Sequence, residues 1–168
     1  MDPDDADAPL EARPPLLEDL VALCRGLNRE GARYVVLGGM AVIQAGFVRA
    51  TNDIDLLIDT SPENQDRVRR ALMALPDGAV RDMAPDDLDR YVVVRVADEF
   101  VVDLMKSACG IDYEEARGLV DVVEIQGVAI PFASARLLWR TKQTLRDKDK
   151  VDLAFLARLL ESRGENVD

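Results

Sequence analysis

The sequence predicts a mixed α/β (α+β) fold, in which a small mixed sheet has helices packed mainly on one face and further helices at its C-terminal end. Two patterns support this prediction. Short β-branched runs alternate with helix-periodic segments, and residues 134–164 form a long helical tail. The 168 residues, 48% of them hydrophobic, suit one domain with its own core.

The first half of the sheet and its helices are predicted from residues 16 to 59. Gly31 is expected to end an opening helix as its C-cap. Residues 34–39, YVVLGG, form a buried strand that ends in glycines; 40–47 are helical, and 53–59, DIDLLID, form a second strand. The opening helix is indicated by leucines at helical spacing: Leu16, Leu20, Leu23 and Leu27.

A third helix should begin at Ser61, which is a suitable N-cap with Pro62 at the first helical position. Residues 76–78 are predicted to form a turn, 79–83 a brief strand, and 85–89 a turn of helix or a loop.

The remaining strands are predicted as two pairs. Residues 91–105 contain two strands around a turn at Asp98-Glu99, and residues 120–132 contain another pair broken near Gln126-Gly127. The helical tail has a break near Arg146-Asp147. Its core residues are expected to be Trp139, Leu145, Leu153, Phe155 and Leu156.

Residues 1–13 are predicted to be a disordered acidic tail, followed by one domain at 14–168 with a core at 34–132 and C-terminal helices at 133–162. No apolar run approaches the ~20 residues that span a bilayer, and the acidic start is unlike a signal peptide. With Cys24 and Cys109 read as unpaired thiols, we expect a cytoplasmic protein without a membrane partner.

Composition excludes several kinds of chemistry. The chain has no histidine, which excludes Ser-His-Asp triads, Cys-His pairs and His-ligated zinc. The net charge of −11 argues against broad, non-specific binding to nucleic acid, which depends on neutralising phosphates. A local basic cluster remains compatible with binding a nucleotide or an RNA end.

Three acids occupy otherwise apolar strands. Asp53 and Asp55 share one strand face, about 6.6 Å apart. Asp103 lies in a second apolar run, FVVDLM. If the two strands are neighbours, three carboxylates meet, and their repulsion predicts a divalent metal ion. The alternative for the first pair is a solvated strand face.

Glycines and cations near these acids suggest an anion site. Gly38 and Gly39 lack Cβ atoms, so backbone amides there and in a helix starting at Met40 could approach a triphosphate. Arg49 and Thr51 could donate to phosphate oxygens. The alternatives are a tight turn without ligand and ordinary surface loop residues.

A basic cluster in the tail contains Lys142, Arg146 and Lys148. Lys142 and Arg146 lie on one helical face if the helix is unbroken, where they could reach a triphosphate or pyrophosphate. The alternative is a salt-bridged solvent face that also contains Asp147, Asp149 and Asp152.

This pattern resembles the signature of the nucleotidyltransferase superfamily typified by DNA polymerase beta. That signature is a hydrophobic residue, Gly, then Gly or Ser, a spacer, an acid-hydrophobic-acid triplet and a distant third carboxylate. Here it corresponds to Leu37, Gly38-Gly39, thirteen intervening residues, Asp53-Ile54-Asp55 and Asp103. Residues 34–156 also resemble two bacterial groups, the abortive-infection toxin type and the short lincosamide nucleotidyltransferases.

The resemblance implies a nucleotidyltransferase-type sheet and an Mg²⁺-dependent enzyme, with two ions, that moves a nucleoside monophosphate from an NTP, expected to be ATP, to a hydroxyl. Asp53 and Asp55 would be metal ligands, and Asp103 a ligand or general base. The triphosphate would be held by Gly38, Gly39, Arg49, Thr51, Lys142 and Arg146.

The resemblance leaves the acceptor and the biological role open. An RNA end, a protein or a small molecule could accept the nucleotide, in a toxin-antitoxin or a resistance-type enzyme, and a protein partner or a homodimer is possible. The alternatives are a catalytically silent module that binds a nucleotide or a toxin or antitoxin partner, and an interaction protein with an accidental motif.

Overall fold

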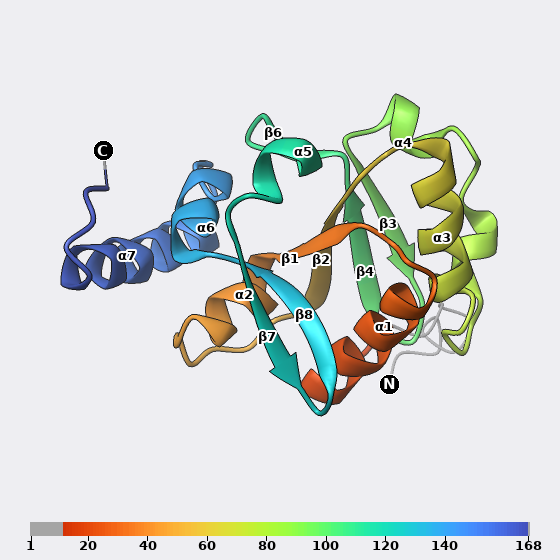
Figure 1. Ribbon diagram of the computed structural model, residues 1–168, viewed down its shortest axis with the longest axis horizontal. Helices are drawn as coiled ribbons and strands as arrows, with labels where there is room; N and C mark the ends of the chain where they lie inside the picture. Colours follow the sequence, from red (N-terminus) through yellow and green to blue (C-terminus); the bar gives the residue numbers. More distant parts are fainter. Residues whose placement is uncertain (1–11, 168) are drawn as a thin grey trace, which may run out of the picture.

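Helices and strands are interspersed along the chain, as expected for a mixed α/β fold (Figure 1). A computed structural model describes residues 12–167, so most of the predicted acidic tail lies outside the described residues. The helices are α1 (Leu17–Arg29), α2 (Gly38–Gln44), α3 (Pro62–Leu72), the 3₁₀ helix η2 (Ala79–Asp82), α4 (Asp87–Arg90), α5 (Tyr113–Ala116), α6 (Ala135–Thr141) and α7 (Asp147–Ser162). The strands are β1 (Tyr34–Leu37), β2 (Asp53–Ile58), β3 (Val93–Ala97), β4 (Val101–Met105), β5 (Ser107–Ala108), β6 (Ile111–Asp112), β7 (Val120–Ile125) and β8 (Val128–Ala133).

A six-stranded sheet with the order β3-β4-β2-β1-β8-β7 forms the centre of the molecule. The neighbours β3/β4, β1/β2 and β7/β8 are antiparallel, whereas β2/β4 and β1/β8 are parallel. The sheet is therefore mixed, which confirms the predicted fold class. Both predicted strand pairs, at 91–105 and 120–132, form antiparallel hairpins.

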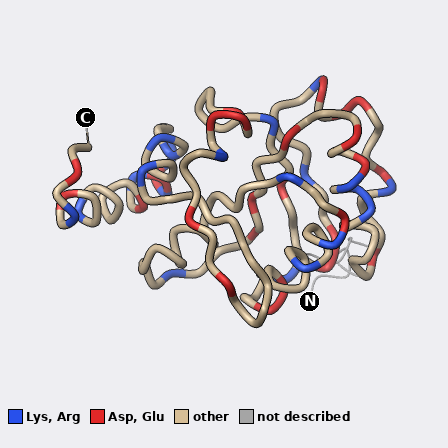
Figure 2. Tube along the Cα trace, in the orientation of Figure 1, with Lys and Arg blue, Asp and Glu red and all other residues tan. Residues whose placement is uncertain are grey.

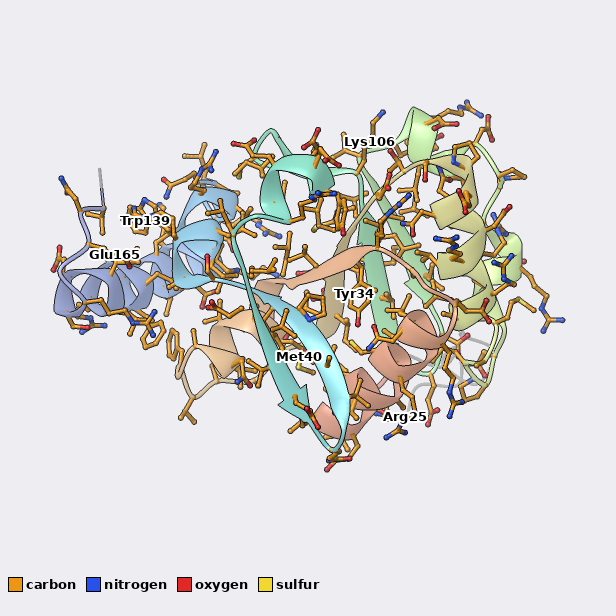
Figure 3. All side chains as sticks on the ribbon, viewed as in Figure 1. Arg25, Tyr34, Met40, Lys106, Trp139 and Glu165 are labelled. Atoms are coloured by element: carbon orange, nitrogen blue, oxygen red, sulfur yellow. The ribbon has the colours of Figure 1, made fainter. Side chains whose placement is uncertain are left out.

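The two faces of β2 have different chemistry because side chains alternate along a strand. Ile54 and Leu56 are fully buried on one face. On that same face, the hydroxyl of Tyr34 in β1 donates to Asn28 of α1 at 2.9 Å, so α1 lies against it (Figure 3). Asp53 and Asp55 lie on the other face of β2, which is the face that does not pack against α1.

Asn64 in α3 ties that helix to the ends of β1 and β2. Its fully buried side chain accepts from the Arg33 amide at 2.7 Å and donates to the carbonyls of Arg33 (2.9 Å) and Asp59 (2.7 Å). Asn64→Ala leaves these backbone groups unpaired, so we expect urea unfolding to show a loss of about 3 kcal/mol. Glu63→Ala, at an exposed neighbour, should change stability by less than about 0.5 kcal/mol, and equal losses would contradict this role.

The brief strand predicted at residues 79–83 is wrong. This segment is the 3₁₀ helix η2, preceded by Gly78 with φ +59°. The carboxylate of Asp98, in the β3–β4 turn, accepts from the amides of Asp77 and Ala79, both at 2.9 Å. These long-range hydrogen bonds satisfy the start of the helix and favour it over a strand.

The helical tail divides into α6 and α7, which pack together at one end of the molecule (Figure 1). The predicted break near Arg146-Asp147 is confirmed, since α6 ends at Thr141 and α7 begins at Asp147. The condition of an unbroken helix is therefore not met, and Lys142 and Arg146 do not share a helical face. Leu145 lies in the connection and is 92% exposed, so its assignment to the core is wrong. Within the described residues, we find no helix long and apolar enough to cross a membrane.

Candidate active site

The three predicted acids meet at one point of the sheet. In the parallel register of β2 and β4, Asp55 lies directly beside Asp103, and Asp53 lies two residues earlier on the same face. One carboxylate oxygen from each of the three lies within 4.8 Å of the other two. The predicted juxtaposition of the carboxylates is therefore confirmed, and we refer to these residues as the acid triad.

The electrostatics of the acid triad suit a divalent cation. Burial, followed by the charges of Asp53 and Asp103, raises the pKa of Asp55 to about 7, while Lys142 and Lys148 act in the opposite direction. A raised carboxyl pKa means that the nearby positive charges do not fully stabilise the ionised form, and a bound cation would do so. Hard oxygen ligands from carboxylates are the ligands that Mg²⁺ binds, so the residues present fit this ion.

Metal-free protein should therefore become less stable with rising pH because of Asp55. Its pKa of about 7 in the fold exceeds the ordinary 3.8, so the folded state binds the proton more tightly between these values. This contribution to stability is lost as pH rises from 3.8 to 7 and stays constant above. We expect Asp55→Asn to exceed wild type in unfolding free energy above pH 7, with the advantage fading toward pH 4. A difference in urea unfolding that is independent of pH would contradict this.

Arg95 in β3 is a site residue that the sequence analysis missed. Its Nε and Nη2 each donate to one oxygen of Asp103 at 3.0 Å, and Nη2 also lies 3.4 Å from Asp53. This bidentate contact offsets part of the triad's charge. A signal was present, since residues 95 and 103 are each four positions from Glu99 and hairpin pairing places them opposite one another.

The two glycines are needed because side chains of the site come very close to them. A Cβ on Gly38 would clash with the carboxylate of Asp55, whose Cγ would be 2.8 Å away, and Gly38 has φ +63°. A Cβ on Gly39 would lie 2.7 Å from Cβ of Thr51. Helix α2 also begins at Gly38 rather than at Met40 as predicted, so both glycines lie in its first turn.

A cleft of about 670 Å³ opens over the acid triad. The predicted cations Arg49, Lys142 and Arg146 line it together with Gly39 and Thr51, whereas Gly38 packs against Asp55 and does not line the cleft. Two further lining residues, Val93 and Met105, form an opposed β3–β4 pair and give the cleft an apolar part. The cleft therefore combines carboxylates for a cation with cations for an anion.

No protein-family model and no curated protein sequence matches this chain. Its structure is similar to the crystal structure of an antigenic nucleotidyltransferase-like protein from Paracoccidioides brasiliensis, with a TM-score of 0.53 and 16% sequence identity. The match covers 87% of this chain and 76% of that chain. The fold is nucleotidyltransferase-like.

Within this nucleotidyltransferase-like fold, two acids of α7 do not lie on a solvent-exposed face, which was the alternative for this part of the tail. Asp149 and Asp152 are 0% and 1% exposed. A signal for their burial exists in the sequence, because they continue the helical stripe formed by Leu156 and Leu160, which are also fully buried. Acidic and basic residues alternate at 146–152, and such mixed charge is typical of a solvated helix. The buried stripe was therefore not recognised from the sequence.

Proposed function

We propose that this protein is a magnesium-dependent nucleotidyltransferase, which moves a nucleoside monophosphate group from an NTP to an acceptor hydroxyl and releases pyrophosphate. The convergence of Asp53, Asp55 and Asp103 in a cleft that is also lined by Arg49 and Lys142 carries this proposal. The nucleotidyltransferase-like fold supports it. Phosphoryl transfer needs mainly positioning and electrostatic stabilisation, and the cleft has charges of both signs for these tasks.

In this proposal the acid triad holds the metal ions. Asp53 and Asp55 would ligate Mg²⁺, and Asp103 would ligate one ion or accept the proton of the acceptor hydroxyl. Mg²⁺ neutralises phosphate charge and orients the attacking and leaving oxygens. Arg95 would have to share Asp103 with that ion, because it already uses both carboxylate oxygens.

The triphosphate would lie between the glycines and the cations. Gly39 and Thr51 line the cleft beside the start of α2, and the Thr51 hydroxyl donates to the Asp53 carbonyl at 3.2 Å. The Asp55 carboxylate packs directly against Gly38, so a phosphate at that glycine would also lie beside the proposed metal ligand. Arg49, Lys142 and Arg146 would balance the phosphate charge.

The acceptor is left open between an RNA end, a protein and a small molecule. The net charge of −11 disfavours a long nucleic acid, whereas the resemblance to toxin-type enzymes favours RNA or protein. We include in this proposal ATP as the preferred donor and a toxin-antitoxin or resistance-type role. The enzyme would act with a protein partner or as a homodimer.

Incubation with each radiolabelled NTP and Mg²⁺ in cell lysate tests the proposed function. We expect transfer of label from the α-phosphate to one class of molecule, together with release of pyrophosphate, and ATP as the best donor. Tight ATP binding without pyrophosphate release would instead identify a silent nucleotide-binding module. No calorimetric heat with any NTP and Mg²⁺ would overturn the proposal in favour of an interaction protein.

A further inference from the structure

The two buried acids of α7 bind the cations that line the cleft. Asp152 Oδ2 accepts from Arg49 Nη2 at 2.8 Å and lies 2.9 Å from Lys142 Nζ. Asp149 Oδ2 accepts from the Thr144 hydroxyl at 2.5 Å and from Arg146 Nε at 2.8 Å, and its Oδ1 lies 3.4 Å from Lys142 Nζ. Figure 2 shows acidic and basic residues side by side at this end of the molecule.

Asp149 is charged despite its burial. Burial alone would raise the pKa of Asp149, but the hydrogen bond from Thr144 and the charges of Lys142 and Arg146 hold that pKa below its ordinary value. A buried carboxylate without a cationic partner is strongly destabilising, so the packing of α7 against the cleft requires these ion pairs. The acids thus contact Arg49 and Lys142 directly and restrict where their positive charges lie.

The network leaves two buried polar atoms unpaired. Arg49 Nε is buried without a hydrogen-bond partner, and so is Asp152 Oδ1, although the two residues are in contact through their other atoms. The guanidinium therefore has one N–H that its ion pair with Asp152 does not use. Arg49 also belongs to the segment between α2 and β2, so Asp152 connects α7 to a segment that ends at the acid triad.

We propose that Asp149 and Asp152 are positioning residues that hold Arg49 and Lys142 in place to bind the triphosphate of an NTP. This inference rests on the proposed function and extends it to α7. Long cationic side chains lose much rotamer freedom when they bind a ligand, so cations that are already fixed bind phosphate at a lower entropic cost. The carboxylates of the acid triad come from β2 and β4, so the proposed metal ligands themselves do not belong to α7.

Asp152→Asn tests this role, with Asp147→Asn as its matched control. Both changes remove one negative charge from the first half of α7. The side chain of Asp147, however, is fully exposed, and its ion pair with Lys150 is long, at 3.8 Å. We expect Asp152→Asn to weaken ATP binding in the presence of Mg²⁺ by about 10- to 100-fold, as for other groups that orient ligand-binding residues. Binding of Mn²⁺ alone to the acid triad should change little, and Asp147→Asn should leave both affinities unchanged.

Hydrogen exchange at residues 49–52 gives a readout that needs no nucleotide. Asp152→Asn should speed exchange there, and Asp147→Asn should not. If Asp152→Asn unfolds, Asp149→Asn takes its place. It should weaken ATP binding through Lys142 and leave exchange at residues 49–52 unchanged, since the cations that Asp149 binds are Lys142 and Arg146. Unchanged ATP affinity in that folded variant would overturn its positioning role. Unchanged ATP affinity and unchanged exchange in a folded variant would overturn the positioning role. A wild-type protein that binds Mn²⁺ but no ATP would overturn the proposed function, while the exchange result would still decide whether α7 holds the Arg49 segment.

Discussion

Asp53→Asn is expected to lower nucleotidyl transfer by about 100- to 1,000-fold, the usual cost of removing one group that stabilises a developing charge. The carboxylate lies in a triad with one oxygen from each residue within 4.8 Å of the other two, so its loss would remove one of the proposed metal ligands. The fold should not suffer, because a neutral amide relieves repulsion among the remaining acids. Pyrophosphate release measures the first effect and thermal unfolding without metal the second.

Asp121→Asn is the control for this substitution. Asp121 is an exposed acid on β7, the edge strand farthest from β3, so its change removes the same charge without touching the cleft. It should leave transfer and Mn²⁺ binding as in wild type. Wild-type transfer in Asp53→Asn would show that Asp53 is not part of the catalytic machinery.

Gly38→Ala should abolish transfer through a single added methyl group. That methyl would occupy the position of the Asp55 carboxylate, and a displacement of the order of 1 Å costs about 100-fold in rate. The backbone adds a second cost, because a residue with a Cβ at φ +63° is strained by about 1–2 kcal/mol. Mn²⁺ binding and pyrophosphate release should both fall, and urea unfolding should show the strain.

Gly127→Ala separates these two costs. Gly127 has φ +78° in the β7–β8 turn, and a Cβ there would meet nothing within 4 Å. The two variants should thus share the backbone strain, while only Gly38→Ala loses metal binding and transfer. If Gly127→Ala lost as much activity as Gly38→Ala, a general loss of stability would explain both results.

Much of the fold was predictable because it depends on local patterns. The leucine spacing in α1 and the alternation in DIDLLID are properties of neighbouring residues, and such patterns survive in the folded chain. The same alternation correctly placed Asp53 and Asp55 on one face. The segment at 79–83 was predicted wrongly because its helical state depends on Asp98, which lies far along the chain.

The site was harder to complete for a similar reason. Arg95 was missed because an arginine on an exposed strand position has no local feature that separates it from a surface residue. Its role depends on the β3–β4 register that sets it against Asp103. Asp149 and Asp152 were missed because only the packing of α7 shows that their partners are cations of the cleft.

Local sequence patterns were enough to predict the fold class and the acid pair on one strand face, because spacing and alternation are set by covalent geometry and by the period of each element. The pairing of Asp103 with Asp55, and of the α7 carboxylates with Arg49, joins segments that are distant in sequence, so it depends on strand register and burial in the whole chain. Arg95 and Asp103 are close in sequence, but their contact depends on the register of the β3–β4 hairpin and on the place of that hairpin beside β2.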